Sequence, residues 1–281
     1  MKQASVKIIA DSTCDFSQAE AQKSGVTIVP MSFSFGEEIY RQGVDLSTAD
    51  FYQKQAASTV QPVTAQLTSY DLELVYRKAV QDGSEAVAIH LSSAMSGTYQ
   101  SAVLASREVG GVYPVDSQNA TFGSALLVRE AVKLRDAGKS APEIAQAISL
   151  LTGRVRVFAY VSTLKYLVRG GRVSAVAGML GGALNICPII AVQNGEVKSI
   201  GKVRGKAAVK QEILRLAETA GIDPDYDVLF GHAMDEAGLV DVKAVFAELV
   251  RGCQTYDHEV GPVIGTHTGP GAVGIAFIGK D

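Results

Sequence analysis

The sequence contains little cysteine, and its cysteines lack metal-binding spacing. Cys14, Cys187 and Cys253 are far apart and form no CxxC motif. An odd and scattered set of this kind argues against a disulfide framework and against a structural zinc site. A large excess of one charge is also lacking, because 26 Lys and Arg residues face 29 Asp and Glu residues, for a net charge of −3. We therefore expect no nucleic acid partner and at most a transient contact with a membrane surface.

A long uninterrupted hydrophobic run is absent as well. The most hydrophobic span, residues 173–192, contains Asn185, Pro188 and three glycines, whereas a membrane helix needs about 20 predominantly apolar residues. The first residues, MKQASVKIIADST, reach a charged residue after a very short apolar run and do not resemble a signal peptide. The composition, with 47% hydrophobic and 20% charged residues, is that of a globular protein. The sequence thus predicts a soluble, cytoplasmic protein of one large or two ordinary domains.

The first half of the chain alternates strand and helix patterns. Short apolar runs predict strands, while apolar spacing and a capping motif that begins at Ser17 predict helices. In chain order we expect a strand over 6–10, a helix after Ser17, a strand over 26–29, a helix over 70–80, a strand over 86–91, a helix over 98–109, a strand over 111–115 and a helix over 125–137. This alternation is typical of a parallel sheet covered on both faces. Residues 1–152 are therefore predicted to form a three-layer α/β/α domain.

The pattern changes near Thr152. Asn194-Gly195 lies between two apolar segments, 189–193 and 196–200, and predicts a hairpin with a type I′ turn. Further expected elements are strands over 154–161 and 228–231, helices over 209–220 and 242–250, and two apolar runs around a glycine-rich loop in 261–279. This mixture predicts a second α/β domain over residues 153–281, with a mixed, partly antiparallel sheet.

Hydroxyl groups are concentrated where three predicted strands of the first half end, at residues 11–13, 92–98 and 116–117. Ligands of parallel α/β sheets gather at the carboxyl ends of the strands. Segment 92–98 leads directly into a helix, whose free amides and dipole favour an anion. Ser96 and Thr98 add hydroxyl donors, and Gly97 lets a ligand approach the backbone closely. The alternative is that Ser96 simply caps the helix.

Familiar catalytic and metal-binding motifs are missing. The sequence contains no phosphate-binding G-x-x-x-x-G-K-[ST], no G-x-S-x-G and no HExxH. Residues 269–274 match G-x-G-x-x-G, but a strand-like run follows, whereas a dinucleotide fingerprint must open a helix. The four histidines lie on separate segments without metal-ligand spacing, so we expect no metal and no cofactor. His267, inside the glycine-rich loop, is the histidine with a candidate functional role.

Residues 175–186 (AVAGMLGGALNI) place small residues beside Leu, Met and Ile. Such a segment permits close approach either by another helix or by a lipid chain. An anion site next to an apolar slot suits an amphipathic ligand such as a fatty acid, whose buried tail contributes about 0.8 kcal/mol per methylene. Ordinary helix packing remains the alternative.

Several separated motifs resemble those of the DegV family, which includes bacterial fatty-acid-binding proteins, and the resemblance covers essentially the whole chain. Residues 92–102 match the family's S-S-x-L-S-G-T-Y-x-S-A, with Met95 in place of Leu. Residues 163–174 match T-L-x-Y-L-x-x-G-G-R-I, and residues 184–190 resemble L-N-I-K-P-I-L. Shorter matches are Asp11-Ser12-Thr13, Asp116-Ser117, Arg204-Gly205 and the segment 267–271.

The resemblance implies a two-domain carrier that holds one long-chain fatty acid between its domains and presents it to a separate ATP-dependent kinase, which forms acyl phosphate for phospholipid synthesis. The carrier itself is then not catalytic. By motif position, the residues implied for the carboxylate are Thr64, Ser93, Ser96, Gly97 and His267. Arg172 and Arg204 are implied at the pocket mouth, where they would meet the kinase, ATP phosphates or anionic lipid head groups.

The chain also departs from the family pattern. The family's P-x-T-S-Q-P-S reads here as Pro62 to Thr68 with Ala65 and Leu67 replacing a serine and a proline, and Cys187 stands where lysine is usual. Other functions stay open at this point. One is a serine hydrolase of acyl esters that uses Ser96 or Ser117 with His267 and an Asp; the others are a carrier of a non-lipid metabolite and a regulatory lipid sensor.

Overall fold

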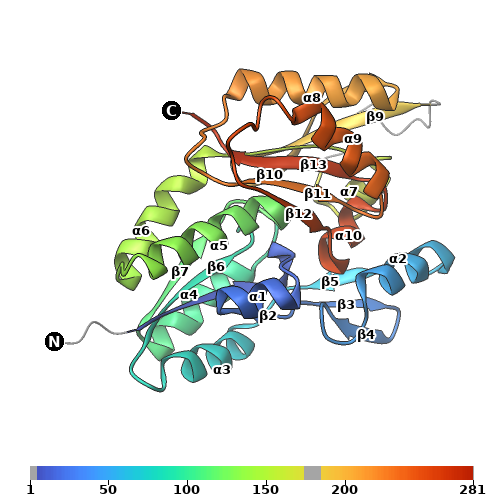
Figure 1. The fold of residues 1–281 in the computed structure, drawn as a ribbon. Helices are drawn as coiled ribbons and strands as arrows, with labels where there is room; N and C mark the ends of the chain where they lie inside the picture. Colours follow the sequence, from blue (N-terminus) through green and yellow to red (C-terminus); the bar gives the residue numbers. More distant parts are fainter. Residues whose placement is uncertain (1–4, 174–184, 281) are drawn as a thin grey trace.

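The computed structural model describes residues 5–173 and 185–280, and its first sheet is parallel, as predicted (Figure 1). The strands are β1 (Val6–Asp11), β2 (Val26–Val29), β6 (Glu85–His90) and β7 (Val112–Asp116), in the order β2-β1-β6-β7. Each pairing in this sheet is parallel. The carboxyl ends of all four strands therefore lie along one edge of the sheet.

Helices cover both faces of this sheet, which confirms the predicted three-layer arrangement (Figure 1). They are α1 (Gln18–Ser24), α3 (Ser69–Val80), α4 (Thr98–Val109), α5 (Thr121–Asp136) and α6 (Ala141–Leu151). Helix α4 packs on β6 and β7 beside α3, while α5 and α6 pack on the opposite face. Their starts are fixed locally, since Ser17 accepts a hydrogen bond from the Glu20 amide and Thr68 forms a capping box with Asp71.

A small sheet, which the sequence patterns did not predict, projects from the first lobe. It consists of β3 (Ser32–Phe35), β4 (Glu38–Arg41) and β5 (Val63–Ala65), in the antiparallel order β4-β3-β5, with α2 (Thr48–Ala57) beside it (Figure 1). Phe33 of β3 packs edge-on against Phe51 of α2, with ring centroids 5.2 Å apart. Because β5 is paired with β3 on this anchored platform, the position of Thr64 is fixed by backbone hydrogen bonds.

The second lobe contains a mixed sheet, again as predicted. Its strands are β8 (Val155–Tyr160), β9 (Ile186–Gln193), β10 (Glu196–Arg204), β11 (Val228–His232), β12 (Thr255–Glu259) and β13 (Val273–Ile278), in the order β10-β9-β8-β13-β11-β12. Only the β11–β12 pairing is parallel. The hairpin between β9 and β10 turns at Asn194 and Gly195, whose φ angles of 52° and 79° are those that a type I′ turn requires.

The remaining helices are α7 (Lys165–Arg169), α8 (Lys206–Ala220), α9 (Glu236–Phe246) and α10 (Pro262–Thr268), with short 3-10 turns η1 (Ser12–Cys14) and η2 (Thr152–Arg154). The expected helix over 242–250 was misplaced. It begins at Glu236 because the Asp235 side chain accepts a hydrogen bond from the Gly238 amide and caps it. The glycine-rich loop expected near residue 265 is partly helical, with Pro262 in the first turn of α10.

Helix α5 joins the two lobes, since it packs on β1 and β6 of the first sheet and on β8, β11 and β13 of the second. The predicted boundary at 152/153 falls in η2 and stays a prediction. Within residues 5–173 and 185–280, no helix combines the length and hydropathy required to cross a membrane. The segment 175–184, the main part of the expected apolar slot, lies outside the described residues.

Candidate functional site

A cavity of about 480 Å³ lies between the carboxyl edge of the first sheet and the second lobe. One part of its lining is polar. It comes from β5, from the turn that precedes α4, from helix α10 and from the segment that follows α7. The residues there are Thr64, Gln66, Ser96, Gly97, Arg172, His267 and Thr268. Most of the remaining lining is apolar and includes Met31, Leu91, Met95, Phe122, Val157, Ala159, Leu167, Ile190, Ala191, Val192, Val197, Val260, Val263, Ile264, Ala272 and Val273.

The apolar walls belong to elements that also form the core. Phe122, in the first turn of α5, lies against Gly231 of β11, where an added Cβ would approach the phenyl ring to 2.2 Å. Val157 and Ala159 of β8 alternate with residues of the opposite face, as a β-strand requires. Rigid strands and a helix start therefore shape this part of the cavity.

At the polar end, β5 and α10 bring Thr64 and His267 together. Thr64 Oγ1 lies 3.0 Å from His267 Nε2, although the two residues are 203 positions apart. Ser96 Oγ lies 3.0 Å from Thr98 Oγ1 and accepts a 3.3 Å hydrogen bond from the Thr98 amide. The hydroxyls of Thr64 and Ser96 thus line one end of the cavity from two separate elements, as the sequence interpretation expected of them.

The sequence left open that Ser96 simply caps helix α4, and the start of this helix differs from that alternative. Gly97, not Ser96, occupies the N-cap position of α4 and has no side chain to cap the helix. The side chain of Gln66 lies directly over Gly97, where an added Cβ would be 2.3 Å from Gln66 Oε1. The Leu67 amide donates a 3.3 Å hydrogen bond to Thr98 Oγ1 and so holds the loop after β5 against this turn. The Thr98 amide, the first of α4, donates to Ser96 Oγ, whereas Gly97 offers no side chain to accept from the amides that follow.

Arg172 supplies the only lining guanidinium among the described residues. Its Nε donates to the Met95 carbonyl at 3.2 Å, and its Nη1 donates to the Gly170 carbonyl at 2.6 Å. In the described part of the chain no carboxylate lies within ion-pair distance of it. A cation that is held by carbonyls and not neutralised by an acid is a strong feature for attracting an anion.

His267 is uncharged at neutral pH. Burial, assisted by the nearby Arg172 guanidinium, lowers its pKa to about 4. Its Nδ1 is buried without a hydrogen-bond partner, and Gly170 packs so closely that an added Cβ would be 2.2 Å from this atom. The neutral ring contributes a hydrogen bond to Thr64 and an apolar surface, with no positive charge of its own.

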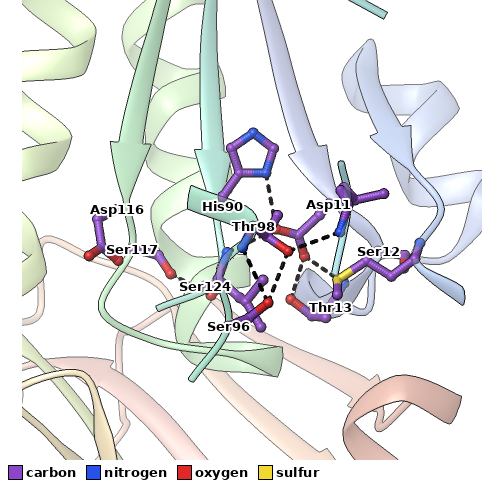
Figure 2. A network of polar contacts seen from close by, with 12 residues as sticks. Asp11, Ser12, Thr13, His90, Ser96, Thr98, Asp116, Ser117 and Ser124 are labelled. Carbon is purple, nitrogen blue, oxygen red and sulfur yellow. Dashed lines mark hydrogen bonds and ion pairs between the residues drawn. The ribbon is translucent and has the colours of Figure 1, made fainter. Parts of the chain in front are cut away.

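The other hydroxyl-rich strand ends are mainly structural. Figure 2 shows the Asp11 carboxylate enclosed by its neighbours at the end of β1. It accepts hydrogen bonds from the Thr13 amide at 3.0 Å, the Thr13 hydroxyl at 2.5 Å and the Leu91 amide at 2.8 Å, with His90 Nδ1 at 3.2 Å. Ser12 Oγ accepts from the Met31 amide at 3.0 Å. This cluster is saturated internally and does not line the cavity.

Ser93 and Ser117 have comparable local roles. The Ser93 amide donates to Asp116 Oδ1 at 3.1 Å, and Ser93 is not part of the cavity lining. Ser117 Oγ donates to the Asn119 carbonyl at 2.9 Å and lies 3.0 Å from Ser124 Oγ (Figure 2). Ser93 therefore lies outside the described cavity lining, and its role at the carboxylate stays a prediction.

Arg204, the second implied arginine, is exposed at the end of β10 and does not line the cavity. Its interpretation as a partner contact stays a prediction. The hydrolase alternative finds no support in the described residues, because His267 bonds to Thr64 and no carboxylate bonds to its Nδ1. The described residues also include no group of His, Cys, Asp and Glu arranged to hold a metal ion.

Sequence reasoning missed Gln66 and the strand residues of the cavity wall. The signal for Gln66 was present, since it lies within the altered motif around Thr64. The sequence gives no signal for Val157, Ala159 and Ile190, because a strand residue that faces a cavity has the same hydrophobic pattern as one that faces a core.

Sequence comparison finds relatives along the whole chain. A family model described as an uncharacterised protein of the DegV family matches residues 5–280. A DegV domain-containing protein of Deinococcus radiodurans is 34% identical over 279 residues, which cover 97% of this chain and 98% of the relative. A second, from Caldanaerobacter subterraneus subsp. tengcongensis, is 31% identical over 275 residues, covering 97% and 98%.

Solved structures of similar fold are described as lipid-binding or fatty-acid-binding proteins. A DegV family protein of Thermus thermophilus, described by its fatty acid binding, superimposes with a TM-score of 0.88 at 29% identity and covers 98% of this chain and 99% of its own. DegV of Bacillus subtilis, described as a fatty-acid-binding protein, gives a TM-score of 0.86 at 28% identity, with 99% and 100% covered. A DegV lipid-binding protein of Thermotoga maritima gives 0.88 at 29% identity, with 98% and 99% covered.

Proposed function

Because this chain belongs to the DegV family, we propose that it binds one long-chain fatty acid in the cavity between its lobes. The carboxylate lies at the polar end, where Thr64 and Ser96 donate hydrogen bonds and Arg172 supplies positive charge. The single observation that carries the proposal is the combination in one cavity of an unneutralised guanidinium with extended apolar walls. Structural relatives described as fatty-acid-binding proteins support it.

The physical chemistry of the cavity suits this ligand. Its volume of about 480 Å³ falls within the range of roughly 300–1,000 Å³ that is usual for small-molecule sites. Each buried methylene of the tail contributes about 0.8 kcal/mol. A buried carboxylate without partners would be unfavourable by several kcal/mol, and the hydroxyls and the guanidinium offset this loss of hydration.

The proposal extends to the ligand's fate. We propose that the protein is not itself an enzyme but presents the bound carboxylate to a separate ATP-dependent kinase in the cytoplasm, which forms acyl phosphate for phospholipid synthesis. Supporting this, His267 has no carboxylate partner and does not take the place of the histidine in a Ser-His-Asp triad. Arg172 and the exposed Arg204 are the residues we propose to face the kinase or its ATP.

Native mass spectrometry of the freshly purified protein, followed by solvent extraction, tests the proposal. One fatty acid per chain is the expected result. A matched pair of variants adds specificity: Val192→Phe enlarges a cavity-lining side chain, whereas Val203→Phe enlarges a residue on the neighbouring strand that does not line the cavity. Val192→Phe should shorten the acyl chain that the protein retains, and Val203→Phe should not. A chain that is empty and takes up no added fatty acid would overturn the proposal.

A further inference from the structure

The carboxamide of Gln66 rests on the polar end of the acyl cavity. Gln66 lines this cavity and is the exposed residue among its polar lining. A Cβ added at Gly97 would lie within 3.0 Å of Cδ, Oε1 and Nε2 of Gln66, which are the three outer atoms of its side chain. The carboxamide therefore occupies the space that a side chain at position 97 would fill, directly before the first turn of α4.

The backbone conformation of Gly97 does not require glycine. Its φ of −72° and ψ of 2° are allowed for residues that have a side chain. Glycine at this N-cap position also deprives the helix of the side-chain acceptor that Ser, Thr, Asp or Asn would supply. What the missing side chain provides is room for the carboxamide of Gln66.

The chain on both sides of Gln66 is held in place, so its side chain is the part that can move. Two positions before it, Thr64 belongs to β5, which pairs with β3, and the Thr64 hydroxyl lies 3.0 Å from His267 Nε2. One position after it, the Leu67 amide donates a 3.3 Å hydrogen bond to Thr98 Oγ1. A change of side-chain rotamer can thus turn the carboxamide without displacing the loop.

A carboxylate at the polar end accepts more hydrogen bonds than the two hydroxyls can donate. It has about four acceptor sites, whereas the hydroxyls of Thr64 and Ser96 have one proton each. Arg172 already uses two of its nitrogens on backbone carbonyls. The carboxamide of Gln66 has two N–H donors, and in the described part of the chain neither of them has a hydrogen-bond partner. Gln66 therefore holds uncommitted donors at the place where the head group lies in our proposal.

We propose that Gln66 is a further binding residue of the acyl site, whose side-chain N–H groups donate to the bound carboxylate, and that position 97 is a glycine because this carboxamide takes the place of a side chain. The inference rests on the proposed binding of a fatty acid. Because Gln66 is exposed, its carboxamide covers the head group on the solvent side. It selects ligands whose head group accepts hydrogen bonds.

Titration calorimetry of the delipidated full chain with tetradecanoic acid and with tetradecanol tests this inference, since the two ligands have the same tail and different head groups. Gln66→Leu removes the donors, and the affinity for the acid should fall roughly 3- to 10-fold. Gln66→Glu places a carboxylate against that of the ligand, so the affinity for the acid should fall at least about tenfold. The affinity for the alcohol should change less than about twofold in Gln66→Glu, because the hydroxyl of the alcohol can donate to the new carboxylate.

Gln61→Glu is the matched control. It adds the same charge to the same segment outside the cavity lining and should leave both affinities unchanged. The melting temperature of each variant is measured in parallel. The inference is overturned if the wild-type chain binds the acid and both Gln66 variants bind it equally well, or if the affinities for acid and alcohol fall by the same factor. A wild-type chain that binds no fatty acid overturns the acyl proposal itself, and this inference with it.

Gly97→Ala tests the assignment of the glycine. The added methyl group displaces the carboxamide of Gln66, so the affinity for tetradecanoic acid should fall in the wild-type background and fall less in a Gln66→Ala background. Equal losses in the two backgrounds would contradict this assignment.

Discussion

Two clusters of polar side chains lie at the carboxyl edge of the first sheet, and they differ in how completely their hydrogen bonds are made. Around Asp11, the carboxylate accepts from two amides and a hydroxyl (Figure 2). Around Ser96 and Arg172, the N-cap Gly97 has no side chain to accept a hydrogen bond, and the guanidinium has no acidic partner among the described residues. We propose that the first cluster is structural because its hydrogen bonds are made within the chain, and that the second binds the ligand because its polar groups are not fully paired.

The same residue types therefore serve two purposes at neighbouring strand ends. Asp11-Ser12-Thr13 and Ser96-Gly97-Thr98 look alike as sequences of turn-forming, hydroxyl-bearing residues. The two segments differ in how completely their polar groups form hydrogen bonds within the chain. The comparison predicts that variants of the first cluster affect stability, whereas variants of the second affect ligand binding.

The largest effect is expected from Asp11→Ala. Removing this carboxylate leaves buried donors from Thr13 and Leu91 unmatched, and we expect a loss of about 3–5 kcal/mol in the free energy of unfolding. Urea denaturation measures it, with Thr64→Ala as the comparison. If Asp11→Ala lowers the free energy of unfolding no more than Thr64→Ala does, the distinction between the two clusters is wrong.

Acid should act on the same residue. Burial opposes ionisation of Asp11, but hydrogen bonds from His90, Thr13 and Leu91 outweigh it, so that the pKa lies below the ordinary 3.8. A carboxyl with a lowered folded-state pKa stabilises the fold above 3.8, and this contribution is lost as the pH falls through the folded pKa. Asp11→Ala should therefore flatten the acid limb of a stability–pH curve below about pH 4.

Arg172→Met should have the next largest effect. It removes the charge that we propose to face the acyl carboxylate, and a hydrogen bond to a charged group is worth about 1.5–3 kcal/mol. Fatty acid affinity should fall roughly 10- to 100-fold. Arg169→Met removes the same charge from an exposed arginine of α7 that does not line the cavity, and equal losses in both variants would argue against a specific role for Arg172.

Ser96→Ala and Thr64→Ala should each reduce affinity by a smaller factor. A neutral hydrogen bond contributes about 0.5–1.5 kcal/mol, which corresponds to roughly a 2- to 13-fold change. Isothermal titration with a long-chain fatty acid measures the change. Ser93→Ala is the control, because Ser93 lies outside the cavity lining, and a comparable loss there would restore Ser93 to the carboxylate group.

The smallest effect at neutral pH is expected from His267→Gln, since the pKa of His267 is lowered to about 4 and its ring is uncharged. Between pH 6.5 and about 4 the unfolded chain binds a proton that the folded site does not, so wild-type stability should fall in this window as the pH decreases. The His267→Gln variant should lose less stability than the wild type over the same pH window. Nuclear magnetic resonance titration of the His267 ring gives an independent reading, and a pKa near 6.5 would contradict the account.

Much of the fold follows from local patterns. The helix over 98–109 and the strand over 26–29 lie where apolar spacing places them, because one buried face dominates each sequence. The small sheet was not predicted, since the position of β3 depends on packing against α2, which is remote in sequence. Helix α9 was shifted because its start depends on the cap at Asp235.

The site was predictable only in part. Thr64, Ser96, Gly97, Arg172 and His267 line the cavity and Ser93 and Arg204 do not, because a motif records neighbours in sequence and not the direction of a side chain; the roles that the family motifs imply for these residues stay predictions. The described apolar walls include residues of α5, β8, β9 and α10, which have the pattern of ordinary core. Whether a polar group is satisfied depends on contacts such as that between Thr64 and His267, 203 residues apart.

The central claim is that the unsatisfied cluster, and not the saturated one, holds the acyl carboxylate. A crystal structure of the chain in complex with a saturated long-chain fatty acid tests it most directly. The account predicts one acyl chain in the cavity, with a carboxylate oxygen about 2.5–3.0 Å from the hydroxyls of Thr64 and Ser96 and the Asp11 cluster unchanged. A carboxylate bound elsewhere, or a tail that points toward Arg172 with the head group at β8, would contradict it.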